Sequence, residues 1–443
     1  MTKQRDNFGR TVLDALYRLD FGAFAYAAFA ALYGKPLVAN WHIDHICYLL
    51  QQMAGGKADG RLVINLPPRS LKSSIVSVFW VAWLLGHDPT KKILCASYSE
   101  DLAFKFSRDC RTLIETDFYK RIFPRTRVSR RKATEGEFET TRGGYRLATS
   151  VGGTLTGRGG DVLIVDDPIK ANDAGSRTAL VGANEWFQNT AISRLDDPSK
   201  SLIVVTMQRL HQGDLSGTLI DSGWPSVVIP AIAVEPADHL VGKGKFYHRP
   251  VGQQLQPDRD SIEPLEAIKR QVGSTIFAAQ YQQNPTPAEG NMIKAAWLQR
   301  YAQPPDSKSL RQIVLACDPA GKAGPRNDYT AMTVWGVGKT DAYLLDATRG
   351  RWTVSQMRER VLFLASSWTP SRVLIEDTAS GMGLIQWLKE EPALNIVGRR
   401  SKDDKETRMA RHQGRFEALR IVLPKSLTQN SICIDALLRG GGR

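Results

Sequence analysis

The sequence predicts an α/β protein with two domains, the first of them a doubly wound domain with a mainly parallel sheet. Two observations predict this fold class. Short apolar runs alternate with helical stretches in two separate series, and a segment rich in proline, glutamine and glycine lies between them. A chain of 443 residues is also too long for one ordinary hydrophobic core. We expect an N-terminal helical segment (1–55), a first domain (56–235), a connecting region (236–308) and a second domain (309–443).

The first series has apolar runs that stop at turn residues, as buried parallel strands do. Residues 61–66 stop at two prolines, and residues 162–165 stop at Asp166. The other predicted strands are residues 92–97, 202–206 and 227–232, with helices expected at 10–55, 73–85 and 102–123. Strands that alternate with helices in this way are typical of a doubly wound sheet.

The second series contains three strands, a helix and a further strand. They are expected at residues 313–316, 331–337, 342–346, 354–366 and 373–375. The first and the last of these strands lead directly to Asp318 and Glu376. Three strands in a meander, a helix and another strand are typical of a ribonuclease-H-like (RNase H-like) α/β domain.

The charge of the chain indicates its kind of partner. Lysine and arginine outnumber aspartate and glutamate by 59 to 45, which gives a net charge of +14. This surplus favours a polyanion, with nucleic acid first and an acidic membrane surface second; a merely basic surface is the alternative. Five scattered cysteines without CxxC spacing favour a reducing cytoplasm over a disulfide framework or a zinc site. Residues 21–33 are apolar but too few to span a bilayer, so we expect a packed helix there and no membrane partner.

A phosphate-binding loop is predicted at residues 66–73, Leu-Pro-Pro-Arg-Ser-Leu-Lys-Ser, between a strand and a helix. Such a loop needs backbone N–H groups around phosphate, a lysine for the β- and γ-phosphates and a hydroxyl for Mg²⁺. Lys72 and Ser73 supply the last two. Leu66 and Leu71 occupy the places of the expected glycines, so a plain strand–turn–helix junction is the alternative. The predicted nucleotide-binding residues are Pro68, Arg69, Ser70, Leu71, Lys72, Ser73 and Asp166.

Two carboxylates complete this pattern. Asp166 and Asp167 follow the apolar run Val-Leu-Ile-Val, as in the second half of an ATP–Mg²⁺ site. Asp166 would hold Mg²⁺ together with Ser73, and Asp167 would orient and activate the attacking water. The alternative is a strand-end pair that caps the next helix. Because both halves occur in the required order, the sequence predicts a P-loop ATPase domain with ATP and Mg²⁺ as cofactors.

Further residues are candidates for catalysis and coupling. Arg158 lies among glycines and is predicted to be a catalytic arginine finger, in its own or a neighbouring subunit. A flexible loop with a solvated arginine is the alternative, and Arg69 is a second candidate for the same role. Thr206 and Gln208 follow the fourth strand and are predicted to sense the γ-phosphate and pass the signal on. A simple transition from strand to loop is the alternative.

Seven segments of the chain together resemble the terminase large subunits of tailed phages. They are residues 66–73, 96–103, 150–161, 166–168, 207–215, 279–285 and 374–381. The resemblance implies an ATPase with a deviant P-loop of the Pro-Pro-Arg type, which forms a homo-oligomeric ring on the portal protein of a procapsid. It also implies double-stranded DNA and a small terminase subunit as partners. The expected place is the host cytoplasm, docked on the procapsid and not in the mature virion.

The same resemblance implies an RNase H-type nuclease that cuts concatemeric DNA. Asp318 and Glu376 would be its catalytic acids and would hold Mg²⁺ or Mn²⁺ in two-metal cleavage, with Asp328 as a helper. The third acid of the family, in a late Asp-Asp-x-x-Asp stretch, is not found. The tail from Lys425 onwards has Asp435 as its only carboxylate side chain. We therefore expect a truncated or divergent C-terminal end and an impaired nuclease.

DNA contact is predicted at Lys405 and Arg408, which lie one helical turn apart and could share a face toward phosphates. A solvated helix face is the alternative. Two other functions stay open. A helicase-like or other DNA-dependent ATPase would share the nucleotide site without the metal acids, and a decayed prophage product would bind DNA or capsid without catalysis.

Overall fold

The computed structural model divides the chain into two compact units. The first unit comprises Met1–Glu266 and Thr275–Pro287, and the second comprises Ala267–Ser274 and Ala288–Arg443. The structure describes residues 2–153, 155, 157–285, 293, 297–319, 329–377, 379–400 and 405–425, without the side chains of 2–8, 379–380, 405–408 and 410–411.

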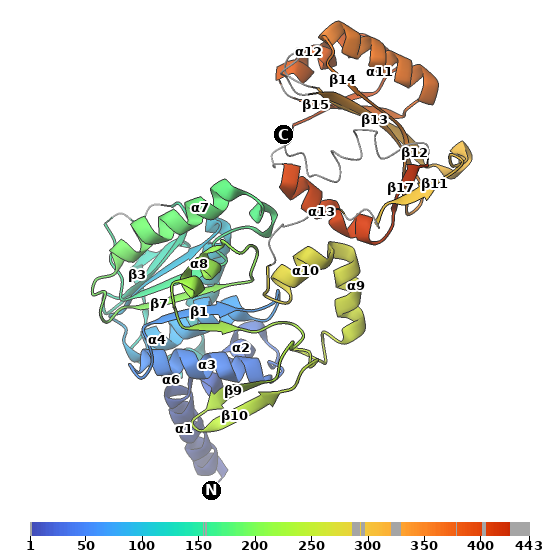
Figure 1. Cartoon of the computed structure of the whole chain (residues 1–443). Coiled ribbons are helices and arrows are strands. Elements are labelled where there is room, and N and C mark those ends of the chain that lie inside the picture. Colours follow the sequence, from blue (N-terminus) through green and yellow to red (C-terminus); the bar gives the residue numbers. More distant parts are fainter. Residues whose placement is uncertain are drawn as a thin grey trace. The chain divides into compact units, whose positions relative to one another are not determined.

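The first unit, mainly blue and green in Figure 1, is built on a sheet of eight strands. Their order is β3-β4-β5-β2-β6-β7-β1-β8. Its strands are β1 (Arg61–Asn65), β2 (Lys92–Ser97), β3 (Val128–Ala133), β4 (Glu137–Thr140), β5 (Tyr145–Ser150), β6 (Val162–Asp166), β7 (Leu202–Met207) and β8 (Ser226–Val228). In the order of the sheet, the six strands β5, β2, β6, β7, β1 and β8 pair in parallel. Strands β4 and β3 extend the sheet beyond β5 with antiparallel pairing. The order of the parallel strands departs from their order in the sequence, which confirms the predicted doubly wound α/β fold.

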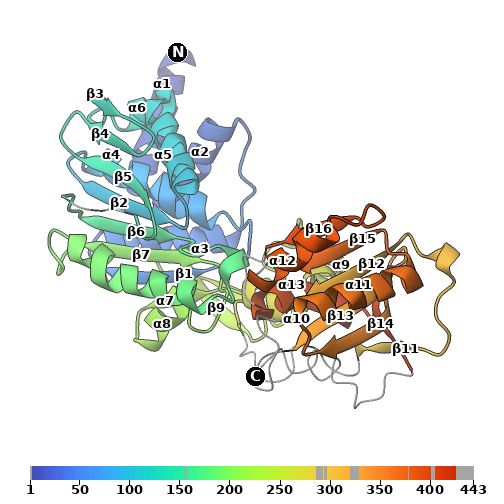
Figure 2. The same ribbon diagram turned by 90° about the horizontal axis from the view of Figure 1, so that it is seen from above.

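Helices cover both faces of this sheet because its central strands are apolar on both sides. In β1, Leu62 and Ile64 face a core shared with α2 (Phe21–Tyr33) and α3 (Trp41–Ala54), whereas Val63 faces the opposite core. Further helices of this unit include α1 (Thr2–Leu19), the π-helix η1 (Ser74–Trp80), α4 (Val81–His87), α5 (Glu100–Glu115), α6 (Asp117–Ile122), α7 (Arg177–Trp186) and α8 (Leu215–Asp221). Figure 2 shows α5 and α7 on opposite sides of the sheet.

Helix α2 is the packed helix predicted at residues 21–33. Asp20 caps its start by accepting a hydrogen bond from the Ala23 N–H at 2.8 Å, and Gly34 ends it with a left-handed φ of 70°. Phe21 and Phe24 are fully buried. Among the described residues, no helix is long and apolar enough to cross a membrane.

Residues 237–249, within the stretch expected to connect the domains, form a hairpin on the first unit. Strands β9 (Ala237–Gly242) and β10 (Lys245–Arg249) pair antiparallel, and Trp41 of α3 stacks on Tyr247 with ring centroids 4.9 Å apart. Two helices follow, α9 (Ile262–Val272) and α10 (Ser274–Gln280). This hairpin holds the start of α3 in place behind the phosphate-binding loop.

The second unit contains a seven-stranded sheet in the order β11-β17-β14-β13-β12-β15-β16. Its strands are β11 (Gln299–Tyr301), β12 (Gln312–Asp318), β13 (Thr330–Val337), β14 (Ala342–Gly350), β15 (Arg372–Glu376), β16 (Ile396–Arg399) and β17 (Ile421–Pro424), and its helices are α11 (Val354–Trp368), α12 (Ala379–Leu388) and α13 (Lys405–Glu417). Strands β12, β13 and β14 form the predicted antiparallel meander, and β15 lies parallel to β12. This arrangement confirms the RNase H-like α/β fold.

Candidate functional site

The predicted phosphate-binding loop after β1 has left-handed backbone conformations at residues that are not glycine. Arg69 and Leu71 adopt left-handed φ angles of 61° and 63°. Leucine in this region costs on the order of 1–2 kcal/mol, a cost that glycine avoids. Leu71 therefore adopts the left-handed backbone conformation that a glycine at this position would favour. The helix that follows starts directly at Lys72, and the Ile75 N–H donates to the Leu71 carbonyl at 3.0 Å.

The structure brings the two predicted halves of the nucleotide site into direct contact. The Lys72 Nζ lies 2.9 Å from the Asp167 Oδ2, and the Lys72 side chain is only 8% exposed. The Ser73 hydroxyl donates to the Asp166 Oδ1 at 2.9 Å. The Ser77 hydroxyl, one turn further along the helix, donates to the Asp166 Oδ2 at 2.8 Å. The ends of β1 and β6, far apart in sequence, thus form one cluster.

The pKa values of Lys72 and Asp166 depend on their burial and on the neighbouring charges. Burial lowers the pKa of Lys72, but the carboxylates of Asp167 and Asp166 outweigh it, so the pKa rises and the lysine stays cationic. Burial, and then the neighbouring Asp167, raise the pKa of Asp166 to about 7. A divalent cation beside Asp166 would favour its ionised form.

The cluster also contains polar groups that fit a phosphate–metal ligand. Ser70 is 1% exposed, and its hydroxyl has no hydrogen-bond partner among the described residues. The Thr206 hydroxyl is buried and likewise lacks a partner within the described part of the chain. Buried hydroxyls are usually paired, so these two groups fit a site that takes a polar ligand such as a phosphate. The Ser73 hydroxyl and the Asp166 carboxylate are oxygen ligands of the kind that Mg²⁺ prefers.

The predicted coupling residues lie at the same edge of the sheet. Thr206 pairs with Asp166 across β7 and β6, and its carbonyl accepts from the Asp167 N–H at 2.8 Å. The Gln208 N–H donates to the Asp167 Oδ1 at 3.3 Å. Asp167 itself has a left-handed φ of 46°. Gln208 therefore contacts Asp167 through its backbone N–H, a contact that cannot be predicted from the type of its side chain.

Arg158 lies against β4 and β5. Its Nη2 is 2.8 Å from the Glu137 Oε1, and its guanidinium carbon lies 5.4 Å from the centre of the Tyr145 ring. Its flanking residues 154 and 156 lie outside the described residues. The Arg69 side chain is exposed, and its carbonyl accepts a hydrogen bond from Arg259. The finger role of either arginine stays a prediction.

Sequence reasoning missed a polar cluster behind the phosphate-binding loop. His42 is fully buried; its Nδ1 lies 2.7 Å from the Asn40 Oδ1, and its Nε2 lies 3.3 Å from the Ser70 carbonyl. The Asn40 Oδ1 and the Ser70 carbonyl can both only accept, so the single N–H of a neutral ring donates to one of the two. Burial lowers the pKa of His42 to about 4, which keeps the ring neutral. The Gln256 amide nitrogen lies 3.4 Å from the His42 Nε2. Asn40, the cap of α3, was the one sequence signal for this cluster.

The two predicted nuclease acids lie at the ends of adjacent strands. Cys317 of β12 pairs with Ile375 of β15, so the next residues, Asp318 and Glu376, end the two parallel strands side by side. Among the described residues, no group of three histidine, cysteine, aspartate or glutamate side chains could hold a metal ion. Asp328 and Asp435 lie outside the described residues.

The predicted DNA contacts belong to α13. Lys405 and Arg408 lie in the first turns of this helix, and their side chains lie outside the described residues. Their role as DNA contacts stays a prediction.

Comparisons with known proteins agree with this architecture. Residues 315–437 match a family model described as "Terminase RNaseH-like domain". That range includes Asp318, Glu376 and Asp435. A search of curated proteins gave no match.

Solved structures show the same fold over most of the chain. The large terminase of the thermophilic bacteriophage D6E matches with a TM-score of 0.53 at 11% identity, over 86% of this chain and 87% of that chain. The same protein in complex with ADP matches with a TM-score of 0.52 at 11% identity, over 86% of this chain and 88% of that chain. These comparisons confirm the fold class and support the resemblance to terminase large subunits that the seven segments carry.

Proposed function

We propose that this chain is a terminase large subunit, which drives double-stranded DNA into a viral procapsid by hydrolysing ATP. The family model over residues 315–437 and the fold shared with a large terminase support this proposal. One observation carries the ATPase half: Lys72, Ser73 and the Asp166–Asp167 pair meet in one buried cluster. The large terminase of phage D6E, which has the same fold, is known in complex with ADP, which supports a nucleotide at this cluster.

Each residue of the cluster has a different proposed role in ATP binding or hydrolysis. Lys72 would bind the β- and γ-phosphates, because its charge is fixed by the two aspartates. Ser73 and Asp166 would hold Mg²⁺, which when bound neutralises charge that develops on the transferred phosphoryl group. ATP binding would draw Lys72 away from Asp167. Asp167 would then be free to accept a hydrogen bond from the attacking water and orient it in line with the γ-phosphate.

For the second unit we propose a metal-dependent endonuclease that cuts concatemeric DNA. Asp318 and Glu376 would hold Mg²⁺ or Mn²⁺ at the ends of β12 and β15. With two carboxylates in place, metal binding is weaker than with three, so we propose that this half is impaired. Metal-dependent cleavage of plasmid DNA by the purified chain, lost in Asp318→Ala, would contradict the impairment.

The proposed partners follow from charge and from the resemblance. A net charge of +14 suits the phosphate backbone of double-stranded DNA, and sequence-neutral phosphate contacts are what a translocating motor requires. We propose the portal protein, a small terminase subunit and further copies of this chain as the protein partners, with the host cytoplasm as the place of action. Lys405 and Arg408 remain the proposed DNA contacts.

ATP hydrolysis with and without linear double-stranded DNA tests the proposal. We expect hydrolysis that DNA stimulates and that Asp167→Ala abolishes. Hydrolysis stimulated equally by single-stranded DNA would favour a helicase-like ATPase. No hydrolysis, even with portal and small subunit present, would favour a decayed prophage product.

A further inference from the structure

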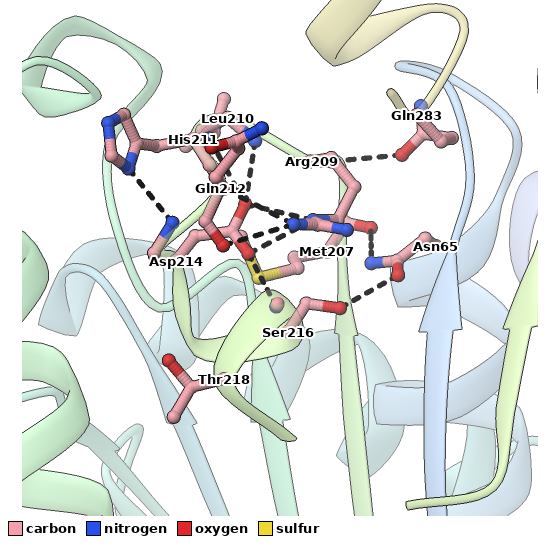
Figure 3. Close-up of polar contacts among 12 residues, drawn as sticks. Asn65, Met207, Arg209, Leu210, His211, Gln212, Asp214, Ser216, Thr218 and Gln283 are labelled. Atoms are coloured by element: carbon pink, nitrogen blue, oxygen red, sulfur yellow. Dashed lines mark hydrogen bonds and ion pairs between the residues drawn. The ribbon is translucent and has the colours of Figure 1, made fainter. Parts of the chain in front are cut away.

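A buried glutamine ties the end of the first unit to the loop after β7. The Gln283 Oε1 accepts a hydrogen bond from the Arg209 backbone N–H at 2.9 Å (Figure 3). Gln283 is 3% exposed and has a left-handed φ of 54°. A buried glutamine in that conformation costs on the order of 1 kcal/mol or more and persists only where its surroundings over-determine it. Gln283 belongs to residues 279–285, called the exit segment, and it contacts residues 208–214, called the sensor loop.

The sensor loop, residues 208–214, is held as one rigid piece. Asp214 is fully buried and accepts from the backbone N–H groups of Leu210 and Gly217 at 2.9 and 2.8 Å. It also accepts from the Arg209 Nε at 3.0 Å, and Figure 3 shows these bonds converging on one carboxylate. A side chain at Gly217 would place its Cβ 2.0 Å from the Gln212 carbonyl, so the packing here requires glycine. A fully satisfied buried network of this kind moves as a unit.

Two neighbouring backbone groups of the sensor loop bond in two directions. The Gln208 N–H donates to the Asp167 Oδ1 at 3.3 Å, and the next N–H, of Arg209, donates to Gln283. Asp167 in turn pairs with Lys72 at 2.9 Å. A continuous path of polar contacts therefore runs from the phosphate-binding lysine to Gln283, and every link in it is shorter than 3.4 Å.

The exit segment, residues 279–285, is the last part of the first unit before the chain continues into the second unit at Ala288. Three contacts hold it. The Tyr281 carbonyl accepts from the Ala231 N–H at 2.7 Å, and the Gln282 side chain bonds to both the N–H and the carbonyl of Ile232, at 2.9 and 3.0 Å. The third contact is the Arg209–Gln283 bond, the one that leads to the nucleotide cluster.

We propose that Gln283 is a positioning residue that couples the nucleotide state at Asp167 to the exit segment. Nucleotide that takes Lys72 away from Asp167 shifts the Gln208 N–H, and the rigid sensor loop carries this shift to Arg209. The Arg209–Gln283 bond then tightens or loosens the exit segment. This inference rests on the proposed ATPase function and adds to it the route by which hydrolysis reaches the chain leading to the second unit.

Hydrogen–deuterium exchange on the full chain tests the route. Exchange is followed in peptides covering residues 66–80, 207–214 and 277–285, with ADP–Mg²⁺ and with ATPγS–Mg²⁺. In the wild-type chain we expect all three peptides to differ between the two nucleotides. At 277–285 the expected difference is about fivefold, the factor that corresponds to one net hydrogen bond of about 1 kcal/mol. In Gln283→Met the first two peptides should still respond and the third should not.

Gln282→Met is the matched control. It removes two hydrogen bonds from the same segment but leaves the Arg209–Gln283 bond intact, so the nucleotide response of 277–285 should persist despite a comparable loss of stability. Gln283→Met also removes the bond that the Gln283 Nε2 donates to the Gln280 carbonyl in the same segment, and Gln282→Met controls for a loss of this kind.

The outcomes separate the inference from the function on which it rests. A wild-type chain in which 66–80 responds and 277–285 does not would overturn the inference whatever the variants do. So would a response at 277–285 that survives in Gln283→Met. If 66–80 itself gives no response, the proposed nucleotide function fails, and the inference fails with it.

Discussion

Leu71 allows a direct test of whether residues 66–73 form a phosphate-binding loop that has lost its glycine but kept its shape. The perturbation is a pair of variants, Leu71→Gly and Leu71→Ala. Both remove the partly buried leucine side chain, so the difference between them isolates the backbone. At the observed φ of 63°, alanine is disfavoured by about 1–2 kcal/mol. Glycine loses about 0.4–1 kcal/mol through the larger entropy of its unfolded chain.

The difference between the middles of these two ranges leaves Leu71→Gly more stable than Leu71→Ala by roughly 0.8 kcal/mol. This corresponds to a rise of about 1–4 °C in Tm for a unit of this size. Differential scanning calorimetry measures it, with added ADP used to identify the transition of the nucleotide-binding unit. Leu102, in helix α5, supplies a control pair in which alanine should be the more stable by about 1 kcal/mol. Equal stability at position 71, or alanine above glycine there, would refute the left-handed loop.

Three further predictions follow from other contacts. The pKa of His42 falls from its ordinary value of 6.5 to about 4 on folding, so between these pH values the imidazole is protonated in the unfolded chain and neutral in the folded chain. The free energy of unfolding should therefore be highest above about pH 6.5 and should fall by about 3 kcal/mol as the pH falls toward 4. Urea titrations at a series of pH values measure this loss, and His42→Gln should reduce it. If Arg158 is the finger, Arg158→Ala should lower kcat for DNA-stimulated hydrolysis by about 10³-fold or more and leave ATP binding unchanged. Lys132→Ala, which removes the other ion-pair partner of Glu137, should leave kcat unchanged. Equal rates in the two variants would exclude Arg158 as the finger. Any Mn²⁺-dependent cleavage should be lost in Asp318→Ala, and its loss in Asp435→Ala as well would identify the third acid.

Much of the fold could be predicted because its signals are local. The predicted apolar runs at residues 61–66 and 162–165 are short, continuous and followed by turn residues, and both correspond to buried parallel strands in the structure. Lys72 and Asp167 could be assigned to one site because the carboxyl ends of parallel strands meet at one edge of a sheet. Their contact at 2.9 Å agrees with that reasoning.

The rest depends on contacts between segments that are distant in the sequence. Nothing near Arg158 indicated that it would pair with Glu137 of a different strand. His42 resembled an ordinary helix residue, and only the fold brings it to the carbonyl of Ser70. Gln283 matched a family segment without any chemical reason, and its bond to the Arg209 backbone supplies one.

The most direct test of the central claim is ATP hydrolysis measured with linear double-stranded DNA in three matched chains: wild type, Asp167→Asn and Asp318→Asn. Asp167 belongs to the nucleotide cluster and Asp318 to the end of β12, so the two variants change one site each. We expect DNA-stimulated hydrolysis in the wild type and in Asp318→Asn, and none in Asp167→Asn. Hydrolysis that persists in Asp167→Asn, or that disappears in Asp318→Asn while that chain remains folded, would contradict it.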